Sequence, residues 1–329
     1  MKKIKLAYID FWGGFDKESF VFTRILKERY EIIFTDENPD FIICSNFGKR
    51  ALNYQCPRIL YSAEAKAPDF NIYDYAMGFD DIIFGDRYLR YPYYMTDTDT
   101  LNLALKKHTM PDEFFLSKDK FCCFVASNNL GSNARELYFD ALCKYRKVDS
   151  GGRLKNNLPD GKPVEDKLVF QKQYKYAFAF ENSSFPDYCT EKIIDAWAAG
   201  AIPLYWGDPK VADDFDTKAF IDCTKMKSPD ELIERIKEIE AEPELYLQMQ
   251  KTPILTEKSR VKEILSDDYL KCFLYKIFDQ DACDAFRRNS KSTMWGWNHE
   301  HHMLQWSIME EKKVFQYLRD ITKKYRNRK

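Results

Sequence analysis

Short apolar runs alternate with segments of helical periodicity through the first third of the chain. Strands are predicted at 4–11, 31–34, 41–44, 58–62 and 76–79, and a helix is predicted at 17–29. Alternation of strands and helices is typical of a parallel sheet with helices on its faces. Residues 92–118 are polar and punctuated by proline, so we place a domain boundary within this stretch.

A second alternating series follows this boundary. It begins with a buried strand at 120–128 and a helix at 132–146, and it continues through a strand–helix–strand unit, a strand at 219–223 and helices at 228–239 and 243–250. The predicted organisation is therefore two α/β domains, 1–117 and 118–270, followed by a helical tail at 271–329.

The strand–helix–strand unit reads YKYAFAFENSSFPDYCTEKIIDAWAAGAIPLYWGDP, and its polar residues gather at one end. Thr190 is the predicted helix N-cap, and Gly200 is the predicted stop. The free N–H groups of such a helix start attract an anion, and Lys192 adds a full positive charge. Glu191 is suited to hydrogen-bond a ribose diol. The plainer alternative is that Glu191 and Lys192 only decorate the start of a helix.

A similar arrangement precedes it in VASNNLGSNARELYFDAL, residues 125–142. A strand leads into a polar loop and then into a helix with Arg135 in its first turn, and arginine is suited to forked contact with a diphosphate. Taken alone, Arg135 is equally well explained as a helix-surface residue. Two cationic helix starts in one domain favour a diphosphate held between them. The sequence contains neither GxGxxG nor GxxxxGKS, so it supports neither a dinucleotide dehydrogenase nor a P-loop nucleotidase.

Composition limits the kinds of partner and the cellular compartment that we expect for this protein. The formal net charge of −1 gives no general attraction to nucleic acid. The nine cysteines contain no CxxC pair, which favours a reducing compartment. The apolar run near the N-terminus is interrupted by Asp10 and fits a first strand better than a signal peptide. We therefore expect a cytoplasmic protein.

The C-terminal segment 312–329 carries eight Lys or Arg residues and one Asp, a charge of +7. Val314, Leu318, Ile321 and Tyr325 fall on one face of a predicted amphipathic helix. Two interpretations stand side by side. The helix packs on the body of the protein with a solvated basic face, or it adheres to an anionic membrane surface such as the inner face of the cytoplasmic membrane.

The segment FAFENSSFPDYCTEKIIDAWAAGAIPLYWGDP resembles the signature of α-1,3-fucosyltransferases. The similarity extends to RILYSAEAKAPDFNIYDYAMGFDDIIFGDRYLRYPYY, FVASNNLGSNARELYFDAL and DFWGGFDKESF, and it is greatest to the bacterial, soluble branch. The resemblance implies two Rossmann-like domains facing each other across a cleft (the GT-B type). It also implies an acceptor site in the first domain, GDP-L-fucose in the second, and inversion at the anomeric carbon.

Matched position by position, the resemblance implies that Glu64 is the general base and that Glu181 is a second catalytic residue, an acid near the fucose that stabilises positive charge on the sugar ring. Without it, Glu64 would be interpreted as a solvated loop acid. The expected donor contacts are Arg135 and Lys192 to the diphosphate, Glu191 to the ribose, and Asn182, Tyr188 and Ser127 elsewhere on the nucleotide sugar. GDP-fucose is then the donor substrate, no cofactor is required, and a divalent metal is at most stimulatory.

The implied acceptor is the 3-OH of N-acetylglucosamine in lactosamine-type glycans, which gives Lewis-type products. Three alternatives remain: use of the 4-OH as well, transfer from another nucleotide sugar, and a lectin-like or nucleotide-sensing protein that does not need Glu64. Asp97-Thr98-Asp99 fits the metal motif DxD only weakly, and His299–His302 is interpreted as a surface histidine cluster.

Overall fold

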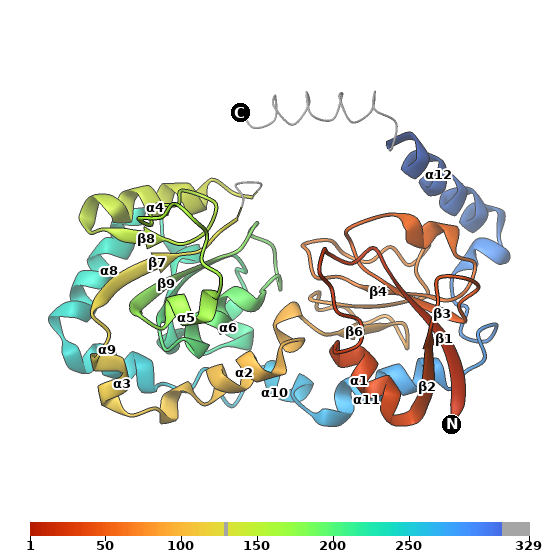
Figure 1. Ribbon diagram of the computed structural model, residues 1–329, viewed down its shortest axis with the longest axis horizontal. Coiled ribbons are helices and arrows are strands. Elements are labelled where there is room, and N and C mark those ends of the chain that lie inside the picture. The colour runs from red at the N-terminus through yellow and green to blue at the C-terminus, as the bar shows by residue number, and fades with distance from the viewer. Residues whose placement is uncertain (128–130, 311–329) are drawn as a thin grey trace. The chain divides into compact units, whose positions relative to one another are not determined.

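The computed structural model describes residues 1–127 and 131–310. The chain divides into two compact units, each with its own sheet (Figure 1). Unit 1 is formed by Met1–Gly78, Ile82–Leu89 and the segment that starts at Leu270. Unit 2 is formed by Phe79–Asp81 and Arg90–Tyr269. The predicted boundary at residue 117 differs from this division, and residues 271–310 of the predicted tail belong to unit 1.

Unit 1 has a six-stranded sheet in the order β2-β1-β3-β4-β5-β6. Its strands are β1 (Lys2–Ile9), β2 (Tyr30–Phe34), β3 (Phe41–Cys44), β4 (Arg58–Tyr61), β5 (Tyr75–Gly78) and β6 (Tyr88–Arg90). Its helices are α1 (Val21–Arg29), α11 (Asp267–Phe278) and α12 (Met294–Glu310), with 3-10 helices η1 (Arg50–Asn53) and η6 (Asn289–Lys291). The pairs from β2 to β5 are parallel, so the carboxyl ends of these strands meet at one edge.

Unit 2 has a five-stranded parallel sheet in the order β11-β10-β9-β7-β8. Its strands are β7 (Lys120–Phe124), β8 (Val148–Ser150), β9 (Tyr174–Phe180), β10 (Ile202–Trp206) and β11 (Ile221–Asp222). Its helices are α2 (Thr98–Leu105), α3 (Asp112–Leu116), α4 (Ala134–Tyr145), α5 (Lys167–Gln171), α6 (Glu191–Ala198), α7 (Val211–Asp214), α8 (Pro229–Ala241), α9 (Pro243–Lys251) and α10 (Val261–Ile264). Its 3-10 helices are η2 (Tyr93–Met95), η3 (Lys107–Thr109), η4 (Thr217–Ala219) and η5 (Cys223–Lys225).

Both faces of the unit 2 sheet are covered, which explains why its strands read as nearly continuous apolar runs. Phe178 and Phe180 of β9 lie in a core cluster with Leu142 of α4 and Ile236 of α8. Ala177 of β9 faces the other side and packs with residues of α5 and α6. This alternation places α6 directly over β9, and the helix begins at the edge where β9 ends (Figure 1).

Most predicted strands are confirmed to within two or three residues, and β3 has the predicted ends. The helix predicted at 17–29 begins at Val21, because the carboxylate of Asp16 accepts the Glu18 N–H and forms a turn before it. The strand predicted at 219–223 is reduced to β11. The stretch 92–118, predicted as a linker, contains α2 and α3. The predicted basic amphipathic helix at 312–329 lies outside the described residues. Within them, no helix is both long and apolar enough to cross a membrane.

Candidate active site

Glu181 is the first residue after β9, and its side chain is completely buried. Its carboxylate accepts hydrogen bonds from the Thr190 backbone N–H (2.7 Å) and Thr190 Oγ1 (2.8 Å), and from Lys192 Nζ (2.9 Å). Gly207, just after β10, leaves room for this carboxylate, because a Cβ there would lie 2.5 Å from Glu181 Cγ. A buried carboxylate is stable only with such partners, so Glu181 fixes the start of α6.

Thr190 precedes α6 as predicted, but its side chain makes no capping hydrogen bond to the helix. Its hydroxyl instead bonds Glu181 and accepts a hydrogen bond from Lys192 Nζ at 2.7 Å. Thr190 is therefore the N-cap residue of α6, as predicted, but it makes no side-chain capping hydrogen bond. The backbone N–H groups at the start of α6 are left without that side-chain acceptor. The predicted stop at Gly200 is confirmed, with a φ of 68° after the last turn.

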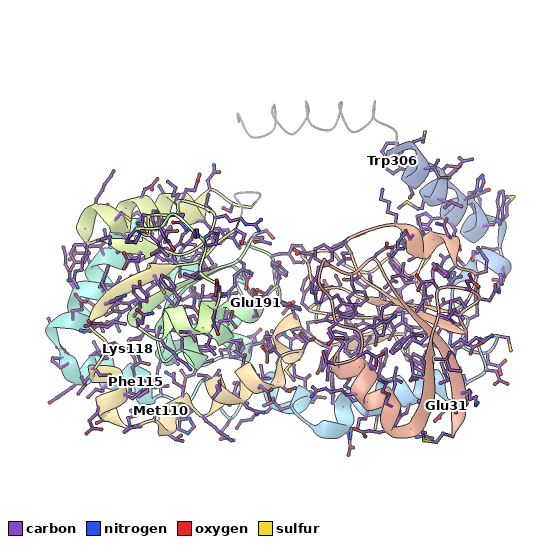
Figure 2. All side chains as sticks on the ribbon, in the orientation of Figure 1. Glu31, Met110, Phe115, Lys118, Glu191 and Trp306 are labelled. Carbon is purple, nitrogen blue, oxygen red and sulfur yellow. The ribbon has the colours of Figure 1, made fainter. Side chains whose placement is uncertain are left out.

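Lys192 and Glu191, at the start of α6, are both held in their ionised forms. Burial by itself would lower the pKa of Lys192, but the carboxylates of Glu181 and Glu191 outweigh burial and raise it. Burial would raise the pKa of Glu191, but Lys192 and Lys167 lower it to about 2. Lys192 Nζ lies 3.6 Å from Glu191 Oε1, and 19% of the Lys192 side chain remains exposed. Lys192 is therefore a fixed cation with one accessible side, at the positive end of a helix. Figure 2 labels Glu191, the first residue of α6.

Arg135 lies in the first turn of α4, and only 4% of the residue is exposed. Its guanidinium donates to the Phe180 carbonyl (2.9 Å) and to Oδ1 of Asn182. The two loops cross here, since Ser132 N–H bonds the Asn182 carbonyl and a Cβ on Gly131 would lie 2.2 Å from the same oxygen. Arg135 and Asn182, predicted from separate segments, are therefore in contact. Ser127 is exposed on the loop after β7, just before residues outside the description.

Tyr188 is buried in the loop between β9 and α6, with its ring edge-on to Phe79 at 5.2 Å. The preceding residue, Asp187, has a φ of 66° and forms ion pairs with Lys210 (3.1 Å) and Arg260 (2.9 Å). Its backbone N–H bonds Oδ1 of Asp208. The loop that leads to Lys192 is thus held in one conformation by charged residues outside it.

The sequence did not reveal these loop anchors. Asp208 is fully buried, and burial raises its pKa to about 6. Asp208 follows Gly207 in the sequence WGDP, directly after an apolar strand. This short polar sequence is the feature that could have indicated a structural role for Asp208. Arg260 lies far along the chain in a charged segment, and nothing local indicates that it reaches Asp187.

Glu64 belongs to unit 1 and lies three residues after β4, at the carboxyl edge where it was expected. The residue is half-buried, and its carbonyl accepts hydrogen bonds from Lys66 N–H (2.6 Å) and Ser62 Oγ (3.2 Å). Six of the predicted residues, namely Glu181, Asn182, Tyr188, Glu191, Lys192 and Arg135, lie around β7, β9 and α6 of unit 2.

The two candidate metal motifs have structural explanations. Asp97 caps α2, accepting the N–H and the hydroxyl of Thr100. His299 Nε2 bonds Asp69, and His301 stacks on Trp297 with ring centroids 4.8 Å apart. Among the described residues, no group of three or more His, Cys, Asp or Glu side chains is arranged to hold a metal ion.

Comparison with known proteins places this arrangement in a family. Residues 6–96 match the N-terminal domain of the α-(1,3)-fucosyltransferase FucT family, and residues 115–284 match the C-terminal part of glycosyltransferase family 10 (fucosyltransferase). The α-(1,3)-fucosyltransferase FucT of Helicobacter pylori is 34% identical over 322 residues, which cover 85% of this chain and 66% of that protein. The human 4-galactosyl-N-acetylglucosaminide 3-α-L-fucosyltransferase 9 is 32% identical over 135 residues, 40% of this chain and 36% of that protein. The chain thus spans slightly less than two thirds of the first relative and about a third of the second.

Solved structures agree with this assignment. A crystal structure of α1,3-fucosyltransferase with GDP is 30% identical and has a TM-score of 0.72, with 88% of this chain and 93% of that chain covered. The complex with GDP-fucose has a TM-score of 0.67 at 30% identity, with 83% and 91% covered. The fold prediction of two parallel-sheet α/β domains of the GT-B type is confirmed. The chain is a member of glycosyltransferase family 10, the fucosyltransferase family.

Proposed function

We propose that this protein is an α-1,3-fucosyltransferase. It moves L-fucose from GDP-β-L-fucose to the 3-OH of N-acetylglucosamine in lactosamine-type glycans, with inversion at the anomeric carbon. The observation that carries the proposal is the fixed cation at the start of α6, where Lys192 is held by Glu181, Thr190 and Glu191. Family membership and the relatives solved with GDP and GDP-fucose support the choice of donor.

In this proposal the donor occupies the edge of unit 2. Lys192 and Arg135 bind the diphosphate, Glu191 bonds the ribose, and Asn182, Tyr188 and Ser127 contact the rest of the donor. Glu181 acts as a positioning residue, because it is fully buried and its carboxylate already bonds Thr190 and Lys192. Fixed cations oriented in advance stabilise the charge that develops on departing GDP without reorganisation.

Glu64 of unit 1 is the proposed base. Its carboxylate takes the proton of the acceptor 3-OH while that oxygen bonds C1 of the fucose. The bond between C1 and the β-phosphate oxygen breaks on the opposite face, and GDP leaves with the electron pair. One displacement of this kind converts the β-linked donor into an α-linked product. Lys192 and Arg135 supply the positive charge that stabilises the departing GDP.

The test is Glu64→Gln, which keeps the shape of the side chain and removes its basicity. GDP binding, measured by thermal shift, should be unchanged, and transfer should fall by about 10²-fold or more. Unchanged turnover in Glu64→Gln would reject the base assignment, although the donor assignment would remain.

A donor screen separates the alternatives. Thermal shift and hydrolysis should favour GDP-fucose over GDP-mannose and UDP-sugars, and a preference for another donor would make the chain a transferase for that sugar. Acceptors with a free 3-OH or only a free 4-OH distinguish α-1,3 from α-1,3/4 activity. Binding of nucleotide without transfer to any acceptor would identify a nucleotide-sensing protein.

We also propose a cytoplasmic location with peripheral contact to an anionic membrane through 312–329. The charge of +7 in this segment supports the contact. So does α12 before it, which exposes Trp297 (55%), Trp306 (48%) and Ile308 (53%); Figure 2 labels Trp306 on this helix. Indole rings and basic residues are favourable at a membrane surface. Flotation with vesicles containing anionic lipid should be lost on deletion of 312–329, and unchanged flotation would reject this contact.

A further inference from the structure

A group of aromatic side chains lies at the carboxyl edge of the unit 1 sheet. Trp12 and Phe47 form its corner, with ring centroids 6.0 Å apart and ring planes at 77°. Behind Trp12, the rings of Phe11 and Phe15 stack at 4.0 Å, and Phe15 lies edge-on to Trp12 at 5.2 Å. Phe47 is 50% exposed, whereas Trp12 is half-buried against its neighbours. The rings of Trp12 and Phe47 are therefore partly exposed to solvent, while Phe11 and Phe15 pack behind Trp12.

The corner and Glu64 occupy equivalent positions on three adjacent strands. Trp12 lies three residues after the end of β1, Phe47 three residues after β3, and Glu64 three residues after β4. These strands are neighbours in the order β1-β3-β4 and run parallel. Adjacent strands are about 4.8 Å apart, so the row from β1 to β4 spans about 10 Å. A disaccharide laid along this edge has the matching length.

The loops that carry the corner are locked together. Asp10 has a φ of 61°, a strained conformation for a residue other than glycine. Its carbonyl accepts the Phe47 N–H at 3.1 Å, and its buried carboxylate accepts the Ala51 N–H at 3.0 Å. Gly48 allows this approach, because a Cβ there would lie 2.2 Å from Asp10 Oδ1. The loop after β1 is therefore fixed to the loop after β3.

A second set of bonds fixes the loop after β3 to the loop of Glu64. Asn46 Nδ2 donates to Ser62 Oγ at 2.7 Å, and Ser45 Oγ donates to the Tyr61 carbonyl at 3.0 Å. Ser62 Oγ in turn reaches the carbonyls of Glu64 (3.2 Å) and Lys66 (2.8 Å). The spacing between the aromatic corner and Glu64 is thus set by the native fold before any ligand binds.

We propose that Trp12 and Phe47 form an acceptor subsite that binds the apolar face of a pyranose ring. This ring is the neighbour of the sugar whose hydroxyl Glu64 deprotonates, so the subsite rests on the proposed function. Aromatic rings bury the C–H face of a sugar at little cost in side-chain entropy, and the hydroxyls at the ring's rim stay in water. A rigid corner loses less freedom on binding than a flexible loop would. The subsite selects acceptors by length, favouring a disaccharide over a monosaccharide.

The test compares N-acetylglucosamine with N-acetyllactosamine as acceptors for wild type, Trp12→Ala and Phe47→Ala. Each substitution should raise KM for the disaccharide about tenfold and leave kcat/KM for the monosaccharide within about twofold. Trp12→Phe should keep most of the disaccharide preference. Hydrolysis of GDP-fucose and the thermal shift with GDP should be unchanged. Trp295→Ala is the matched control, since this indole is 77% exposed on α12 rather than on the loops after β1 and β3, and it should leave both acceptors unaffected.

An unchanged ratio between disaccharide and monosaccharide in Trp12→Ala and Phe47→Ala would overturn the subsite. Saturation-transfer NMR of the disaccharide with the GDP-loaded protein measures the same contact without turnover. If wild type transfers no fucose, the proposed function fails, but loss of the NMR signal in Trp12→Ala would still establish the subsite. Retention of that signal in both alanine variants would reject it.

Discussion

The ammonium group of Lys192 lies 2.9 Å from Oε2 of Glu181, a carboxylate that has no exposed surface. The two residues are separated by the whole loop from the end of β9 to the start of α6. Their contact converts a flexible lysine side chain into a cation of fixed position. The same carboxylate holds Thr190, so one buried group organises both the loop end and the charge at the helix start.

Glu181→Gln tests this organisation directly. The amide keeps an acceptor for Thr190 but removes the negative charge opposite Lys192. Breaking a buried pair of this kind costs about 3 kcal/mol of unfolding free energy, and we expect the KM for GDP-fucose to rise about tenfold or more. Urea unfolding and initial rates measure the two effects. Glu191→Gln, at a partly exposed position, should lower stability much less. A Glu181→Gln enzyme with wild-type KM for the donor would show that this carboxylate does not position Lys192.

Gly207→Ala should impair donor binding without removing any polar group. The new methyl would lie 2.5 Å from Glu181 Cγ and 2.7 Å from its Cβ, so the carboxylate must move away from Lys192. We expect a rise of about tenfold in the donor KM and a fall in stability of about 1–3 kcal/mol. Gly13→Ala is the control for the donor KM, because a Cβ at Gly13 meets nothing within 4 Å. Equal donor KM values for the two variants would contradict the packing argument.

Asp208→Asn should stabilise the protein at neutral pH. Burial raises the folded-state pKa of Asp208 from 3.8 to about 6, so the folded state binds the proton more tightly than the unfolded chain. Wild type therefore loses stability from this group as pH rises from about 4 through 6, whereas the amide cannot ionise. The variant should gain about 3 kcal/mol over wild type at pH 7.5 and about nothing at pH 4. The urea unfolding midpoints of both proteins at pH 4 and pH 7.5 test this prediction. A variant less stable than wild type at pH 7.5 would contradict it.

Lys107 should make the stability of the fold rise with pH, which is opposite to the effect of Asp208. Only 2% of it is exposed, its ammonium donates to the Met249 carbonyl at 3.2 Å, and burial lowers its pKa to about 7. Between pH 7 and the unfolded pKa near 10.5, the unfolded chain holds more protons, so stability rises with pH. Wild type should gain about 2 kcal/mol between pH 7 and 9 relative to Lys107→Met. Chemical denaturation of both proteins at the two pH values measures it, and parallel pH profiles would show that Lys107 titrates normally in the fold.

The sequence located the strands and the polar residues after β7, after β9 and at the start of α6, because short apolar runs and helix starts are local patterns. It also located Thr190 as the N-cap residue, but it did not reveal the partner of the Thr190 side chain, for an equally physical reason. Local rules favour a threonine cap at that position, but Glu181, nine residues earlier, competes for the same hydroxyl through the fold. The role of Gly207 was also hidden, since its requirement for no side chain comes from a neighbouring strand.

The stretch 92–118 shows a similar limit. Its polar composition and prolines predicted a linker, yet α2 forms there with Asp97 as its cap and packs against α6. Short helices gain most of their stability from such packing rather than from their own residues. Likewise, the apolar face of α11 does not indicate which sheet it covers. Contacts across the fold, such as that of Phe278 with Phe41 at 4.7 Å and that of Phe273 with Tyr75 at 6.4 Å, assign it to unit 1.

The return of the C-terminal segment to unit 1 has a consequence for the covalent path of the polypeptide. The backbone passes from unit 1 into the main part of unit 2 at Arg90 and re-enters unit 1 at Leu270, while the short stretch Phe79–Asp81 also belongs to unit 2. Arg90–Tyr269 is therefore inserted within unit 1, and a single proteolytic nick at either end of this insertion leaves the two units covalently joined through the other end. A polypeptide that stops at residue 269 would lack Phe278 of α11 and would leave Phe41 of the unit 1 sheet without this cover.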